Sequence, residues 1–65
     1  MDDKMMLVAR RNRAERLYMA FFEDASIARF RGEYDEAKKC SSMGLKFMEM
    51  ANELDAKINY FNKEK

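Results

Sequence analysis

The stretch RFRGEYDEA, residues 29–37, contains one of only two glycines in a 65-residue chain that has no proline. Basic residues precede Gly32 and acidic residues follow it, which suits the negative end of one helix dipole and the positive end of the next. Glycine also adopts the left-handed conformation that commonly ends a helix. The stretch therefore predicts a sharp turn at residues 32–34 between two helices.

Long helices are expected on both sides of this turn, because good helix formers dominate and Gly44 is the only other glycine. We predict a first helix over residues 2–31, with Asp2 or Asp3 as its cap, and a second helix over residues 34–62. The predicted fold is all-α, with two long antiparallel helices in a single hairpin domain over residues 1–65.

A coiled-coil seam is predicted where the two helices meet, because small or apolar residues alternate at spacings of three and four. The second helix carries Ala37, Cys40, Gly44, Phe47, Ala51, Leu54, Ile58 and Phe61, and the first carries a rougher series at Lys4, Leu7, Arg11, Ala14, Tyr18, Phe21, Ala25 and Ala28. Folding about Gly32 makes the numbers of facing residues sum to 65. This register places the ring of Phe21 over Gly44, where no side chain would obstruct it.

Several apolar residues lie outside the seam, and one neighbouring helix cannot cover them all. The segment LYMAFF, residues 17–22, is apolar on every side of a helix, and methionine-rich surfaces commonly accept helical partners. We therefore predict a protein interface, and its candidate residues are Leu17, Met19, Phe22, Ile27, Met43, Met48 and Met50. Self-association into a homodimeric four-helix bundle would cover them; the alternative is that they only widen the core of the hairpin.

Catalytic residues are scarce, since the chain has no histidine and one cysteine, and a two-helix hairpin offers little concavity. We predict no catalytic, metal or cofactor site, and we interpret Cys40 as a small packing residue. The expected function is a non-enzymatic protein–protein interaction that modulates a regulatory partner.

The segment ARRNRAER, residues 9–16, is the main candidate for nucleic-acid binding. At 100° per residue, its four arginines spread around the helix instead of forming one stripe; they are Arg10, Arg11, Arg13 and Arg16. A net charge of +1 also gives no general attraction to nucleic acid or to an acidic membrane. A basic patch that is either solvated or faces a partner, and that could bind an acidic protein surface, is therefore the favoured interpretation, and a dimer that binds nucleic acid is the alternative.

A cytoplasmic location without membrane association is expected from the hydropathy pattern. The longest apolar run, LYMAFF, is too short to span a bilayer, and the N-terminal MDDK is acidic where a signal peptide would be basic.

Residues 32–47, GEYDEAKKCSSMGLKF, resemble the turn and second helix of a tetratricopeptide or microtubule-interacting-and-transport hairpin at Gly32, Tyr34, Ala37 and the pair Gly44-Leu45. An aromatic residue near Ser41 and a second repeat are missing, so the resemblance implies a hairpin without a transferable peptide groove. In size, in its cysteine-poor composition and in the sequence around Gly32, the chain also looks like the small accessory proteins encoded in the early regions of lambdoid phages. That resemblance implies a bacteriophage protein that binds host or phage regulators in the host cytoplasm.

Overall fold

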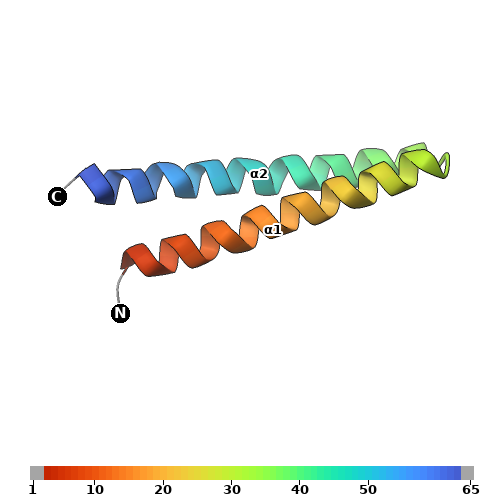
Figure 1. The fold of residues 1–65 in the computed structure, drawn as a ribbon. Coiled ribbons are helices and arrows are strands. Elements are labelled where there is room, and N and C mark those ends of the chain that lie inside the picture. The colour runs from red at the N-terminus through yellow and green to blue at the C-terminus, as the bar shows by residue number, and fades with distance from the viewer. Residues whose placement is uncertain (1–2, 64–65) are drawn as a thin grey trace.

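The computed structural model describes residues 3–63, which form two helices and no strand (Figure 1). Helix α1 spans Asp3–Phe30 and helix α2 spans Tyr34–Lys63, and they lie side by side in opposite directions. The predicted all-α antiparallel hairpin is confirmed. Helix α1 ends one residue before the predicted end and α2 one residue beyond it, whereas the suggested start at Asp2 lies outside the described residues.

The turn between the helices is closed by backbone hydrogen bonds around Gly32, whose φ of 78° is the predicted left-handed conformation. The amide of Glu33 donates to the carbonyl of Ala28 at 2.9 Å, and the amide of Gly32 donates to that of Arg29 at 3.0 Å. This pair of bonds is the Schellman motif, which satisfies the last carbonyls of α1. The carbonyl of Glu33 then accepts from the amide of Ala37 at 3.0 Å, so the N-cap of α2 follows Gly32 directly.

The core is the predicted seam, and every fully buried residue in the described part of the chain belongs to it. Phe61, the last predicted seam residue, is the exception: it is exposed, because the helices have diverged at that end (Figure 1). Small residues dominate near the turn, where Ala25 is 1% exposed and Ala37 is 3% exposed. Larger seam residues such as Leu7 and Ile58 lie farther along the hairpin and are half-buried. The helices accordingly lie close together at the turn and diverge toward the other end (Figure 1). We call this other end, where α1 begins and α2 ends, the far end.

The predicted contact between Phe21 and Gly44 is wrong, because the ring of Phe22 lies over Gly44. A Cβ atom added to Gly44 would lie 2.8 Å from Cε1 of Phe22, closer than real Cβ atoms approach. Phe21 instead stacks on Phe47, with ring centroids 5.7 Å apart and planes inclined by 5°. The first helix is therefore rotated so that Phe22 also points toward α2, and Tyr18 meets the Phe22 ring edge-on at 6.0 Å.

The hairpin is elongated, with extents of 50 × 17 × 12 Å and a radius of gyration of 14.9 Å. A compact domain of 65 residues has a radius of gyration of ~11 Å. Its accessible surface is 5398 Å², whereas a compact monomer of 7.8 kDa exposes ~4,400 Å². The single layer of contact between the helices thus leaves an excess of accessible surface of about 1,000 Å².

Candidate interaction surface

Two flanks border the seam, one on each side. Each flank consists of the residues of α1 and α2 that lie next to the seam on that side, and these residues recur every seven positions along each helix. The closed flank consists of Val8, Glu15, Phe22 and Arg29 from α1 with Ser41, Met48 and Asp55 from α2. The open flank consists of Arg10, Leu17 and Asp24 from α1 with Glu36, Met43, Met50 and Lys57 from α2. Every half-buried described residue outside the seam lies on the closed flank, and every residue of the open flank is exposed.

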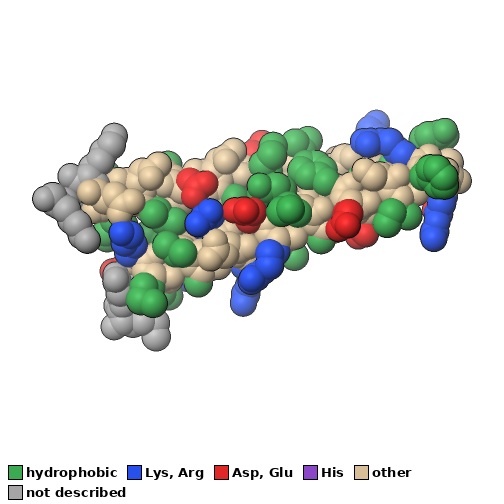
Figure 2. Space-filling model, viewed as in Figure 1, with side chains coloured by type: hydrophobic (Ala, Val, Ile, Leu, Met, Phe, Trp, Pro, Cys, Tyr) green, Lys and Arg blue, Asp and Glu red, His purple; other side chains and the backbone are tan. Residues whose placement is uncertain are grey.

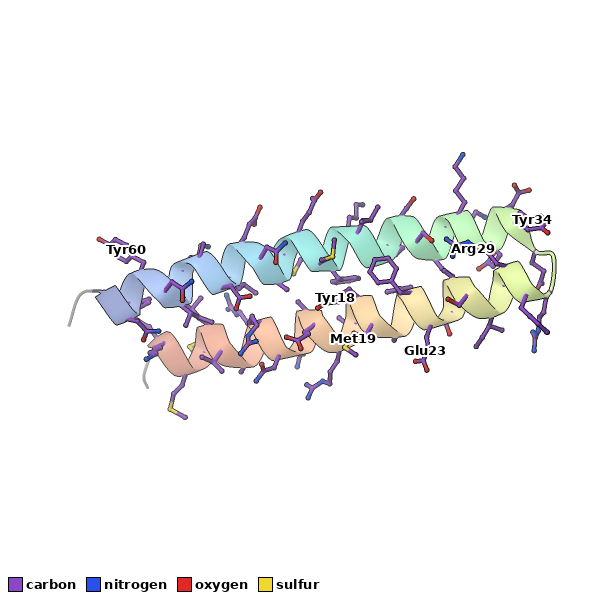
Figure 3. All side chains as sticks on the ribbon, turned by 45° about the horizontal axis from the view of Figure 1, so that its top comes forward. Tyr18, Met19, Glu23, Arg29, Tyr34 and Tyr60 are labelled. Carbon is purple, nitrogen blue, oxygen red and sulfur yellow. The ribbon has the colours of Figure 1, made fainter. Side chains whose placement is uncertain are left out.

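Contacts across the two helices seal the closed flank. The Phe22 ring fills the space beside Gly44, and Met48 is half-buried. Near the turn, Nη2 of Arg29 donates a hydrogen bond of 3.2 Å to Oγ of Ser41, and Figure 3 shows Arg29 reaching from α1 toward α2. The closed flank therefore presents little apolar surface that another molecule could cover.

Arg11, a seam residue, is held by carboxylates of the closed flank. Its Nη1 atom lies 3.2 Å from Oε2 of Glu15, and its Nε atom lies 3.5 Å from Oδ1 of Asp55 on α2. Basic and acidic side chains meet between the helices toward the far end (Figure 2). The Nε atom is itself buried without a hydrogen bond, so Arg11 acts within the hairpin and is not free to bind a nucleic acid.

The open flank combines exposed apolar side chains with a groove between the helices. Leu17, Met43 and Met50 are 36%, 38% and 48% exposed. The groove has a volume of about 370 Å³, and its lining residues are Arg10, Arg13, Ala14, Leu17, Phe47, Met50, Glu53, Leu54 and Lys57. An apolar centre with charged residues at its margin is the usual composition of a protein-binding surface.

The structure divides the predicted interface residues among different surfaces. Leu17, Met43 and Met50 lie on the open flank, whereas Phe22 and Met48 lie half-buried on the closed flank. Two more are exposed elsewhere on α1, with Met19 on the side away from the open flank and Ile27 bordering it. Position on a flank therefore separates residues that hydrophobicity alone had grouped.

The charged residues Asp24, Glu36 and Lys57 of the open flank were not among the predicted site residues. A signal for them exists in the sequence, because they occur at the same seven-residue spacing as Leu17, Met43 and Met50. The exposed apolar residues Leu45 and Tyr60 were also missed, at 49% and 63% exposed.

The four arginines of residues 9–16 do not form one surface. Arg10 and Arg13 line the groove of the open flank, Arg11 is paired within the hairpin, and Arg16 is exposed outside the groove. The basic area available to a partner is therefore small, and Lys57 of α2 extends it across the groove.

Cys40 is a half-buried seam residue at the turn end of the open flank. Burial raises the pKa of its thiol, and the negative charges of Glu36 and Asp24 raise it further. The thiol is therefore held in its protonated, less nucleophilic form. No group of three or more potential metal ligands occurs within residues 3–63.

Neither helix, over its described length, is long and apolar enough to cross a membrane. No family model, curated protein or solved structure matches the chain.

Proposed function

We propose that this chain is a non-enzymatic protein–protein interaction module that self-associates through its open flank into a four-helix bundle and modulates a regulatory partner by binding. One observation carries the proposal: Leu17, Met43 and Met50 are exposed on the open flank, while Phe22 and Met48 on the closed flank are half-buried. A second pair of helices on the open flank would complete the burial that α1 and α2 begin.

The excess of accessible surface supports self-association. A standard interface buries about 800 Å² on each partner, which is close to the excess of about 1,000 Å² that the hairpin exposes relative to a compact monomer. Full burial of one Leu or Met side chain contributes about 1.5–3 kcal/mol. Leu17, Met43 and Met50 are already partly covered, so each contributes only a fraction of that value.

The proposed partner beyond a second copy is a host or phage regulator in a host cytoplasm. This part rests on the resemblance to the accessory proteins of lambdoid phages. Exposed Arg10 and Arg13 at the groove margin suit an acidic protein surface, because complementary charge speeds encounter and orients a complex.

Sedimentation equilibrium at micromolar concentration tests self-association, and the chain offers a matched pair of substitutions. Met50 on the open flank and Leu45 on the opposite side of α2 are 48% and 49% exposed. We expect Met50→Lys to shift the protein to monomer and Leu45→Lys to leave the dimer intact. A wild-type monomer at this concentration, or equal effects of the two lysines, would contradict the proposal.

A dimer that binds nucleic acid is the competing function, favoured by the position of Arg10, Arg13 and Lys57 around one groove. The ion pairs of Arg11 argue against it, since they remove one cation from the surface. Binding to duplex DNA would weaken with salt by a log–log slope of about −0.9 for each phosphate contact. Absence of binding to DNA and RNA at low salt would eliminate this function.

A further inference from the structure

The charges of the open flank are separated along the length of the hairpin. At the turn end lie Asp24 of α1 and Glu36 of α2, whose charges both act on the thiol of Cys40. Arg10 of α1 and Lys57 of α2 lie toward the far end, where both line the groove. On each helix, the apolar residues of the open flank lie between the acidic residue and the basic residue. From the turn outward, the order on both helices is therefore acidic, apolar, basic.

Symmetry limits how two such flanks can face each other. Most homodimers have a two-fold axis, and an axis lying in the interface can run along the hairpin or across it. An axis along the hairpin places turn on turn and α1 on α2 of the second copy. An axis across the hairpin places the turn on the far end of the second copy, with α1 on α1 and α2 on α2.

The charges distinguish these two arrangements. With turn on turn, Asp24 and Glu36 face the same two acids of the second copy, and the bases likewise face bases. With the turn on the far end, Asp24 faces Arg10 of the second copy and Glu36 faces its Lys57. Exposed ion pairs add little affinity, but opposed like charges disfavour the wrong arrangement.

The apolar residues fit the same arrangement. Seven-residue spacing is identical along the flank, so pairing Glu36 with Lys57 of the second copy also places Met43 on its Met50. On α1, pairing Asp24 with Arg10 of the second copy places Leu17 against Leu17 of the second copy, at the two-fold axis. Lys46 lies at the edge of the proposed interface near the two-fold axis, so it approaches Lys46 of the second copy. Its long side chain must therefore turn outward to water.

We propose that two copies stack open flank to open flank with the turn of each on the far end of the other, α1 on α1 and α2 on α2. This arrangement rests on the proposed self-association and adds the orientation, which places opposite charges at both ends of one apolar centre.

A distance between two spin labels tests the orientation. Tyr34 lies at the turn, is 71% exposed and is outside the open flank, so Tyr34→Cys in a Cys40→Ala background accepts one nitroxide per copy (Figure 3). Because Tyr34 would lie over Asn59 of the second copy, 25 helical residues from that copy's own Tyr34, we expect a distance of about 40 Å by pulsed electron paramagnetic resonance. With turn on turn, both labels lie at one end of the dimer, separated only by two stacked hairpins that are each 12 Å thick. A distance of that order would overturn the orientation and leave the dimer standing.

Sedimentation of the same labelled protein keeps the two proposals apart. A dimer with a long distance supports both, and a dimer with a short distance overturns only the orientation. A monomer, provided that the wild-type chain is also monomeric, overturns both. If the wild type alone is dimeric, a label on Tyr60, which is 63% exposed and lies toward the far end, replaces that on Tyr34 with the same expected distances.

Charge reversal gives a second readout whose sign depends on orientation. Asp24→Arg opposes the introduced arginine to Arg10 of the second copy, so we expect the dissociation constant of the dimer to rise about threefold to tenfold at low salt. Adding Arg10→Asp in the same chain should restore self-association. Asp35→Arg is the matched control, since Asp35 lies outside the open flank. A tighter dimer on Asp24→Arg would indicate turn on turn and contradict the proposal.

Discussion

The closed and open flanks border the same seam, hold similar apolar side chains, and differ in how much of them the hairpin covers. Phe22 and Met48 are half-buried on one side, while Leu17 and Met50 are exposed on the other. The hydrogen bond of Arg29 to Ser41 and the ion pair of Arg11 with Asp55 both draw the helices together on the closed flank. Rotating α1 toward one flank turns it away from the other, so two helices alone can cover only one side.

Among substitutions that test why the closed flank is covered and the open flank is not, Gly44→Leu is expected to have the largest effect. The leucine must occupy the space of the Phe22 ring, and such overpacking costs about 1–3 kcal/mol, against a gain of about 0.8–1 kcal/mol in helix propensity. We expect a net loss of up to about 2 kcal/mol in the free energy of unfolding, measured by urea denaturation at a protein concentration low enough to exclude self-association.

A double-mutant cycle identifies the ring that meets Gly44. Phe22→Ala should recover part of the loss in the Gly44→Leu background, because residues that touch are energetically coupled. Phe21→Ala is the matched control and should show a smaller coupling energy, since Phe21 stacks on Phe47 instead. Equal coupling at both positions, or a stabilising Gly44→Leu, would place the closest contact of the helices elsewhere.

A smaller effect is expected from Arg11→Met. The ion pairs of Arg11 are partly exposed, its Nε atom lacks a hydrogen bond, and methionine can retain the packing of the aliphatic stem. We expect the free energy of unfolding to fall by less than about 1 kcal/mol, and less still in high salt. Arg16→Met, at an exposed position, is the control. A loss several times larger would mean that this ion pair, more than the packing of Phe22, closes the flank.

The smallest effect concerns Cys40, whose pKa is raised by burial and further by the acids Glu36 and Asp24 at the turn end of the open flank. Alkylation by iodoacetamide at pH 8 should be slower in the folded protein than in the urea-unfolded chain, and Glu36→Gln should accelerate it. Because the folded pKa lies above the ordinary value of 9.0, its stabilising contribution is present below pH 9 and is lost as the pH rises through the folded value.

Cys40→Ala provides the control for that pH dependence. The free energy of unfolding of the wild type should fall relative to this variant between pH 8 and pH 10. If the two proteins respond identically, or if Glu36→Gln leaves the alkylation rate unchanged, Glu36 and Asp24 do not act on the thiol as described.

The seam could be predicted from the sequence because its spacing allows few alternatives. Ala14, Ala25, Ala28, Ala37, Ala51 and Leu54 follow the three-four alternation and are buried as expected. Gly32 could also be predicted, since one glycine between a basic and an acidic segment has a specific role at a helix end. Strong periodicity and turn chemistry thus determined the hairpin.

The flank that closes could not be predicted, because it depends on a rotation of α1 that heptad spacing does not specify. Phe21 and Phe22 are adjacent, equally large and equally apolar, so the pattern cannot choose which one meets Gly44. That choice decides which neighbouring residues are covered, and it separates Met48 from Met50 on α2. Candidate interface residues of similar hydrophobicity therefore differ in how accessible they are to a partner.

The alanine-rich contact beside the turn also has a consequence for the order in which the hairpin assembles. Closing a short loop costs less chain entropy than closing a long one, so Ala28 and Ala37 can meet before any pair farther away. Each contact then shortens the loop that the next must close, and the helices join progressively from Gly32 outward. Leu7 and Ile58, near the far end, would be among the last to pair and the first to separate, so amide hydrogen exchange should slow steadily from the far end toward the turn.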